Sequence, residues 1–206
     1  MGGGVTEALT PAQRAALGSL VGAIDPAAYY LAGGVAVALR LHHRGSRDLD
    51  LFTLSADPSA LAEPFGDPSI VVVSRSQGTL HLTVGGIPAS LLRYRYPLLS
   101  PPEALAGVPV AVASLDDLEC MKLSAIAGRG AARDFWDLHA LLEARSRSLG
   151  EALDGYRRKY ASEDIGHVVR SLVYFAEAEA EPMPAGLTGA LWTRIKADLT
   201  AWVRSR

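Results

Sequence analysis

Two aspartates spaced two residues apart, Asp48 and Asp50, are the side chains of this sequence that most directly suggest chemistry. They lie in DLDLFTL (48–54), which is predicted to be a β-strand. On a strand they would project from one face, roughly 7 Å apart. Carboxylates so close repel one another unless water or a cation lies between them, and Mg²⁺ prefers such oxygen ligands. The pair therefore predicts a Mg²⁺ site, with a solvated strand edge as the open alternative.

A glycine pair, Gly33 and Gly34, precedes the aspartates along the chain. It separates a short apolar segment, YYLA (29–32), from VAVALRLHH (35–43), which has helical composition. Glycine lets an anion approach backbone N–H groups, and the N-terminus of a helix favours negative charge. The pair is predicted to hold the triphosphate of a nucleotide, with an ordinary turn as the alternative.

The elements that would position these residues form a mixed first part of the chain. Capping residues, prolines and apolar spacing predict helices over 11–24 and 58–65, in addition to the one after the glycines. Runs of β-branched and apolar residues separated by glycine-containing turns predict a meander of three strands over 69–75, 79–84 and 87–95. Together these patterns predict an α/β part over residues 1–112.

The second part of the chain, residues 113–206, has helical spacing throughout. One helix is expected from Ser114 to about Ala127, interrupted by Gly128-Arg129-Gly130. A second is expected over 131–145, a third after the capping box that begins at Ser148, and others near 165–179 and 187–204. The fold class is therefore α+β.

The composition of the chain excludes few classes of function. The 206 residues carry a formal net charge of −2, which gives no global attraction to nucleic acid. Cys120 is the only cysteine, so no internal disulfide forms. No signal peptide and no apolar run of about 20 residues is apparent. We expect a cytoplasmic protein without a membrane partner.

Two blocks of the sequence resemble a known family. YYLAGGVAVALRLHHRGSRDLDLF and VAVASLDDLECMKLSAIAGRGAARDFWDLHALL are similar to the AbiEii/AbiGii nucleotidyltransferase toxins of the DNA polymerase β-like superfamily. The resemblance implies a minimal nucleotidyltransferase fold, a small mixed sheet flanked by helices, in residues 1–112. It implies that helical residues 113–206 close the active-site cleft. It also implies Mg²⁺-dependent transfer of NMP from an NTP to an acceptor hydroxyl, with tRNA as a candidate acceptor and an antitoxin protein as partner.

The same resemblance assigns roles to individual residues. Gly33 and Gly34 would cradle the triphosphate, and Asp48 and Asp50 would bind Mg²⁺. Lys122 would contact phosphate, Asp134 would orient or deprotonate the attacking group, and Arg129 is a weaker phosphate-binding candidate. From the residues alone, Lys122 is more typical of a solvated helix face, Asp134 reads equally as a solvent-facing position, and Arg133 and Asp137 read as a surface ion pair.

One position departs from the wider superfamily. Many of its enzymes place a third metal-binding carboxylate on a later strand, where this sequence has Ser90 in GGIPASLLRYRYPLL. This leaves one-metal catalysis, a replacement acid such as Asp134, or lost activity. The alternative function is therefore an inactive nucleotide- or partner-binding module of the same fold. A third reading keeps the activity but makes a protein or small molecule the acceptor.

Basic residues and histidines are the remaining candidates for other sites. Arginines precede the aspartates and recur in RYRY (93–96), a pattern that fits either an RNA-binding patch or scattered surface charge. They are Arg40, Arg44, Arg47, Arg93 and Arg95. None of the histidines considered, His42, His43, His81 and His139, shows metal-ligand spacing. We assign none of them to a metal.

Overall fold

The structure is a computed structural model that describes residues 9–61 and 65–205. The chain divides into two compact units. The first runs through Pro97 and resumes at Pro101–Ser114, and the second consists of Leu98–Ser100 and the chain from Leu115 onward. Each unit is described separately below.

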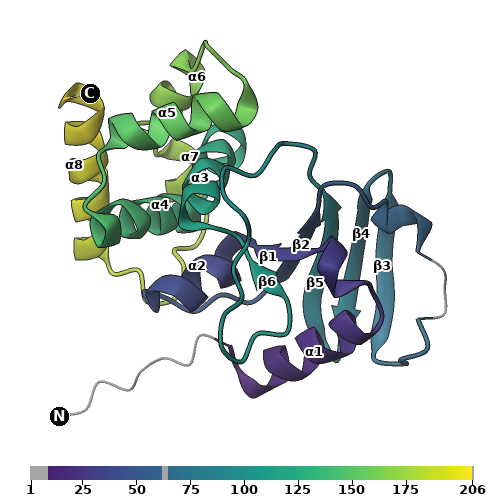
Figure 1. Ribbon diagram of the computed structural model, residues 1–206. Coiled ribbons are helices and arrows are strands. Elements are labelled where there is room, and N and C mark those ends of the chain that lie inside the picture. The colour runs from purple at the N-terminus through teal and green to yellow at the C-terminus, as the bar shows by residue number, and fades with distance from the viewer. Residues whose placement is uncertain (1–8, 62–64, 206) are drawn as a thin grey trace. The chain divides into compact units, whose positions relative to one another are not determined.

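The first unit contains a six-stranded mixed sheet in the order β3-β4-β5-β2-β1-β6 (Figure 1). Its strands are β1 (Tyr30–Ala32), β2 (Leu49–Thr53), β3 (Ile70–Ser76), β4 (Thr79–Val84), β5 (Ile87–Arg93) and β6 (Ala111–Val112). Strands β3, β4 and β5 form the predicted antiparallel meander. Strand β2 pairs parallel to β5 and antiparallel to β1, while β6 runs parallel to β1. The prediction of an α+β fold with a small mixed sheet is confirmed.

Strand β2 shows the alternation that the sequence predicts. Leu49, Leu51 and Thr53 are fully buried, whereas Asp50 and Phe52 are partly exposed. Helix α1 (Pro11–Gly22) packs against β4 and β5, and α2 (Gly33–Leu41) packs against β1 and β2 (Figure 1). The sheet thus has one apolar face and one face on which Asp50 remains accessible.

One local prediction for the first unit needs correction, and two short elements were not predicted. The helix expected over 58–65 is a single 3-10 turn, Pro58–Ala60, because Leu61 is already extended; residues 62–64 lie outside the described chain. The Asp57 carboxylate accepts from the backbone N–H and hydroxyl of Ser59, which satisfies this turn locally. Strand β6 and a 3-10 turn at Pro26–Ala28 were not predicted, since segments of two or three residues show no periodicity.

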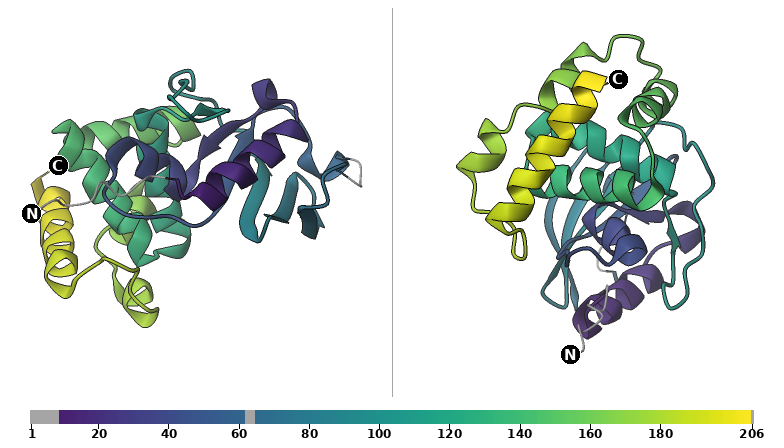
Figure 2. Two further views of the ribbon diagram at one scale, coloured as in Figure 1. Left: turned by 90° about the horizontal axis from the view of Figure 1, so that it is seen from below. Right: turned by 90° about the vertical axis from the view of Figure 1, so that its left-hand side faces the viewer.

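The second unit is helical. It contains α3 (Leu115–Arg129), α4 (Ala132–Arg145), α5 (Leu149–Tyr160), α6 (Gly166–Ser171), α7 (Ala176–Ala180) and α8 (Gly189–Ser205). Figure 2 shows α8 in yellow beside the green helices of this unit, and α8 contacts α4. Their packed side chains include Phe135 and Trp192, whose rings meet edge to face at 5.9 Å. This unit has its own apolar core.

Two helix boundaries in this unit differ from expectation. Helix α3 continues through Gly128 to Arg129, and the chain turns only at Gly130, whose φ is +56°. One glycine inside a helix costs only about 1 kcal/mol, which tertiary packing can offset. The helix expected over 165–179 is instead two short helices, α6 and α7. The capping box at Ser148 and Glu151 is confirmed at the start of α5.

Within residues 9–61 and 65–205, no helix combines the length and apolar character needed to cross a bilayer.

Candidate active site

The glycine turn lies directly against one of the two aspartates. Gly33 is the first residue of α2 and has φ +69°, a left-handed conformation that side chains disfavour. Ala32 is the strand partner of Asp50, so the turn begins beside that carboxylate. A Cβ atom added to Gly33 would lie 2.7 Å from Asp50 Oδ2. The structure therefore brings Gly33 and Asp50 together and leaves no room for a side chain between them.

Gly34 contacts the loop that leads into the aspartates. A Cβ atom there would lie 2.6 Å from Ser46 Oγ and 2.9 Å from Arg44 Nη2. The same loop is held from the other side by α1, because Gln13 Nε2 donates to the carbonyl oxygens of Ser46 at 2.7 Å and Arg47 at 3.2 Å. Residues of α1 and α2, both in the first unit, therefore contact this loop.

Asp48 and Asp50 differ in their surroundings. Asp48 is exposed and immediately precedes β2, while Asp50 is partly buried within this strand, between β1 and β5. Ala32 is the N-cap of α2 and offers no side-chain cap to the N–H groups of the first turn. Carboxylate oxygens are hard ligands that suit Mg²⁺ or Mn²⁺, and the N–H groups at a helix N-terminus suit phosphate. The arrangement fits a divalent metal with a nucleotide phosphate.

Ser90 lies on the strand next to Asp50. The two are register partners in the parallel pair of β2 and β5, so Ser90 stands beside the aspartate where a third carboxylate could have stood. Across the β4–β5 hairpin, His81 is the partner of Ser90, and its Nδ1 lies 3.1 Å from Ser90 Oγ. This contact between His81 and Ser90 was not predicted.

The turn of the β4–β5 hairpin contains a sequence signal from which the pairing of His81 with Ser90 can be predicted. Gly85 and Gly86 form a two-residue turn, and such a turn pairs the residues on either side of it. Counting outward from that turn places His81 opposite Ser90. The pairing was therefore available from the sequence once the two strands had been predicted.

The helical unit gathers the second group of predicted residues. Lys122 Nζ lies 3.0 Å from Asp134 Oδ1 and 2.7 Å from Asp137 Oδ2. Arg129 binds Asp134 through two hydrogen bonds, from Nε at 2.7 Å and from Nη2 at 2.8 Å. Both carboxylates are fully buried, and Lys122 is only 4% exposed, whereas the Arg129 side chain is 55% exposed. The structure therefore brings Lys122, Arg129 and Asp134 together.

Because both side chains are buried and paired, Lys122 and Asp134 are not solvated helix positions. Burial alone raises the pKa of Asp134, but hydrogen bonds from Arg129 and the charges of Lys122 and Arg129 outweigh it and hold the pKa below its ordinary value. Asp137 is a buried partner of Lys122, so the reading of Asp137 as a surface residue paired with Arg133 is wrong. The sequence could not show that Lys122 has two carboxylate partners.

Other charged residues have structural partners. Arg40 donates from Nε to the carbonyl oxygen of Ala113 and from Nη2 to that of Val112, so it ties α2 to the chain around β6. Its side chain is 10% exposed, which removes it from the basic patch considered for RNA. His42 follows α2 as its left-handed C-cap and is not within the helix.

His139 has two carboxylate neighbours that its sequence spacing concealed. Its Nε2 lies 2.8 Å from Asp198 Oδ2 on α8, and its Nδ1 lies 3.5 Å from Glu143 Oε2, one turn further along α4. Arg194 contacts both carboxylates, so a cation of the chain itself already compensates them. We therefore treat this group as an ion-pair network between two helices.

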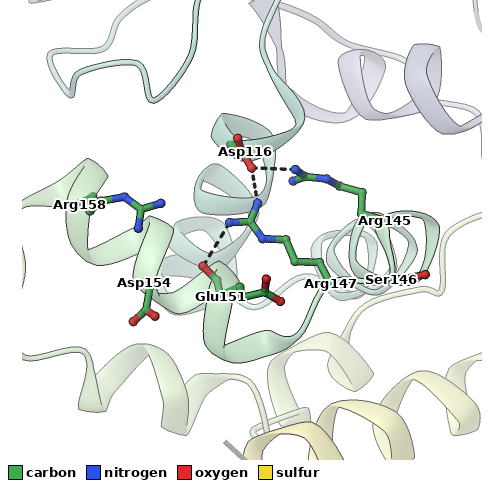
Figure 3. A pocket seen from close by; sticks show the side chains of 7 residues that line it. All are labelled: Asp116, Arg145, Ser146, Arg147, Glu151, Asp154 and Arg158. Carbon is green, nitrogen blue, oxygen red and sulfur yellow. Dashed lines mark hydrogen bonds and ion pairs between the residues drawn. The ribbon is translucent and has the colours of Figure 1, made fainter.

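A charged pocket of about 440 Å³ lies in the helical unit (Figure 3). Arg145 and Arg147 both bind Asp116 in its wall, and Arg147 also donates to the Glu151 carbonyl. None of the residues predicted to bind nucleotide or metal lines this pocket. Arg145 and Arg147 thus pair with carboxylates of the same unit.

Comparison with known proteins gives consistent matches. Residues 70–202 match the family described as "Nucleotidyl transferase AbiEii toxin, Type IV TA system". Protein aq_aa25 of Aquifex aeolicus (strain VF5) is 38% identical over 157 residues, which cover 74% of this chain and 76% of that protein.

Two solved structures are also similar. The antibiotic-resistance factor ANT(2'')-Ia is similar with a TM-score of 0.55 and 17% identity, over 74% of this chain and 95% of that one. JHP933 from Helicobacter pylori gives a TM-score of 0.48 and 18% identity, over 93% of this chain and 92% of that one. The first match shows the polymerase β-like nucleotidyltransferase fold that the sequence resemblance implies.

Proposed function

This chain belongs to the AbiEii nucleotidyltransferase toxin family, and on that premise we propose that it transfers NMP from an NTP to a hydroxyl of RNA, in a reaction that requires Mg²⁺ and releases pyrophosphate. The observation that carries the proposal is the contact between the glycine turn and Asp50. Gly33 has a left-handed backbone and no space for a Cβ atom beside the carboxylate. Backbone N–H groups beside a carboxylate support a site that takes the NTP phosphates together with Mg²⁺.

In the first unit, the NTP phosphates would lie at the N-terminus of α2, against Gly33 and Gly34. Asp48 and Asp50 would hold Mg²⁺ through their carboxylate oxygens. A divalent ion bound there supplies charge neutralisation to the phosphates and alignment to the attacking and leaving oxygens. The loop that is held by Gln13 fixes the start of β2 and so fixes where Asp48 lies.

In the second unit, we propose that Arg129 and Lys122 bind phosphate and that Asp134 positions them. Arg129 is the more exposed cation, so a phosphate can reach it directly. Lys122 can reach a phosphate by exchanging one of its two carboxylate partners. Because Asp134 has a lowered pKa, it is a weak proton acceptor, and this favours the orienting role over the deprotonating one.

The biological setting is also a proposal. The family's description supports a toxin whose activity is countered by an antitoxin protein encoded with it. Such a toxin would act in the cytoplasm, where both NTP and tRNA are present. We propose tRNA as the acceptor because its unpaired end offers a free hydroxyl to an active site.

The test incubates the purified chain with Mg²⁺, each α-labelled NTP in turn and total tRNA, and resolves the products on a denaturing gel. Label should enter RNA with the wild type, and both a chelator and Asp50→Ala should reduce it on the order of 100-fold or more. The matched control is Asp154→Ala, which removes an exposed carboxylate of the helical unit. Absence of label from every acceptor would refute the proposal. If calorimetry then showed tight NTP binding, the chain would be an inactive nucleotide-binding module.

A further inference from the structure

A row of polar residues crosses the accessible face of the sheet. Ser74 on β3 pairs with His81 on β4, His81 pairs with Ser90 on β5, and Ser90 pairs with Asp50 on β2. Directly paired residues project from the same face of a sheet. The hydroxyl of Ser90 therefore lies between an imidazole on one side and the proposed metal-binding carboxylate on the other.

The contact between His81 and Ser90 has the geometry of a base beside a nucleophile. His81 Nδ1 lies 3.1 Å from Ser90 Oγ, within the range for a hydrogen bond. When the ring carries its proton on Nε2, Nδ1 accepts this bond and the serine hydroxyl donates it. A hydroxyl that donates to a neutral imidazole is the usual arrangement for an activated serine.

Ser90 is also close to the place where the proposed function puts the nucleotide. Neighbouring strands lie about 4.8 Å apart, so the serine backbone is one strand spacing from that of Asp50. If Asp50 helps to hold the NTP phosphates, the hydroxyl that His81 contacts lies on the neighbouring strand, on the same face of the sheet. A serine at this position offers the hydroxyl nucleophile that the proposed transfer needs.

We propose that Ser90 is itself an acceptor and that the chain nucleotidylates this residue. Ser90 Oγ forms a bond to the α-phosphorus of the NTP, and the bond from that phosphorus to the oxygen bridging to the β-phosphorus breaks. Pyrophosphate leaves with the electron pair, and the serine proton passes to His81 Nδ1. The inference rests on the proposed function, because the NTP must bind at Asp50. The ester formed would occupy the space beside Asp50 and so limit further turnover.

The experiment incubates the intact chain with Mg²⁺ and each NTP, with and without total tRNA, and follows its mass. The wild type should gain the mass of one nucleoside monophosphate, and fragment ions of the tryptic peptide 76–93 should place it on Ser90. Ser90→Ala should abolish this adduct. His81→Asn places a polar side-chain amide beside Ser90 but removes the base, and it should slow labelling on the order of 100-fold or more. Ser74→Ala, the matched serine on the other side of His81, should label like the wild type.

Several outcomes would overturn the inference. Labelled RNA with unmodified protein would leave the proposed function standing and refute self-modification. An acid-labile adduct on His81, or an adduct elsewhere in the chain, would refute the assignment to Ser90. Equal labelling rates for His81→Asn and the wild type would refute the role of the imidazole. Absence of label from both protein and RNA would refute both proposals, whereas label on Ser90 alone would support this inference and refute the RNA acceptor. Circular dichroism of each variant identifies any that fails to fold.

Discussion

Replacing Gly33 with alanine tests whether the glycine turn is built around Asp50. A left-handed backbone costs an alanine about 1–2 kcal/mol, and Gly33 has φ +69°. The new Cβ atom would also lie 2.7 Å from Asp50 Oδ2, so the carboxylate or the turn must move, at a cost of about 1–3 kcal/mol. We expect the free energy of unfolding to fall by about 2–5 kcal/mol. Nucleotidyl transfer should fall on the order of 100-fold, since a displacement of about 1 Å has that effect on positioned groups.

Two controls separate the backbone cost from the contact. Gly85 has φ +56° and nothing within 4 Å of an added Cβ atom, so Gly85→Ala should cost only about 1–2 kcal/mol. Introducing Gly33→Ala into Asp50→Ala should cost about 1–3 kcal/mol less than in the wild type, because Oδ2 is gone. Urea-induced unfolding followed by circular dichroism gives all three values. An equal cost in both backgrounds, together with undiminished transfer by Gly33→Ala, would refute the reasoning.

Three further predictions concern the helical unit. Lys159→Met should lower the free energy of unfolding by about 3–5 kcal/mol in urea titrations, because it removes the Lys159 cation from the fully buried Asp117 carboxylate. The control, Arg158→Met on the exposed face, should change it by less than about 0.5 kcal/mol. Similar losses in the two variants would contradict the role of Lys159 as a buried ion-pair partner. The pKa of Asp134 is lowered in the folded protein, so its ionised form stabilises the fold above the ordinary aspartate pKa of about 3.9. This stabilisation is lost as pH falls through the lower folded pKa, and the difference in free energy of unfolding between wild type and Asp134→Asn should therefore shrink in acid. A difference that stays constant down to the pH of unfolding would contradict this prediction. Burial raises the pKa of Cys120 to about 12, so a thiol reagent at pH 8 should modify the chain only in urea, and rapid reaction of the folded protein would be the contrary result.

Much of the first unit could be predicted because its signals are local. The capping box of Thr10 and Gln13 starts α1 as expected, since both partners lie within one helical turn. The Gly85-Gly86 turn marks the β4–β5 hairpin for a similar reason: the residues that determine it are adjacent. The glycine turn at Gly33 was also placed correctly between a strand and a helix. Such features depend on backbone conformation over a few residues.

The partners of buried charges could not be predicted in the same way. Lys159 pairs with Asp117, which is 42 residues away in the sequence, and helical spacing gives no information about that distance. The two carboxylates around Lys122 require the angle at which α3 and α4 pack, which no local pattern specifies. A lone lysine on a predicted helix is usually exposed, so local reasoning gives no sign that either lysine is buried. Only the packed helices show that these ammonium groups are buried.

The hydrogen bonds to Asp117 have a consequence for how such a protein can be divided or recombined. Its carboxylate accepts from the backbone N–H groups of Leu99 and Ser100, and these residues belong to the helical unit although the chain before and after them belongs to the other. The polypeptide therefore changes unit after Pro97, after Ser100 and again after Ser114. A gene fragment that stopped at Pro97 would lack β6, and one that began at Leu115 would lack two donors to a buried carboxylate. Exchange of either unit between relatives thus requires several junctions, so the two should be inherited together.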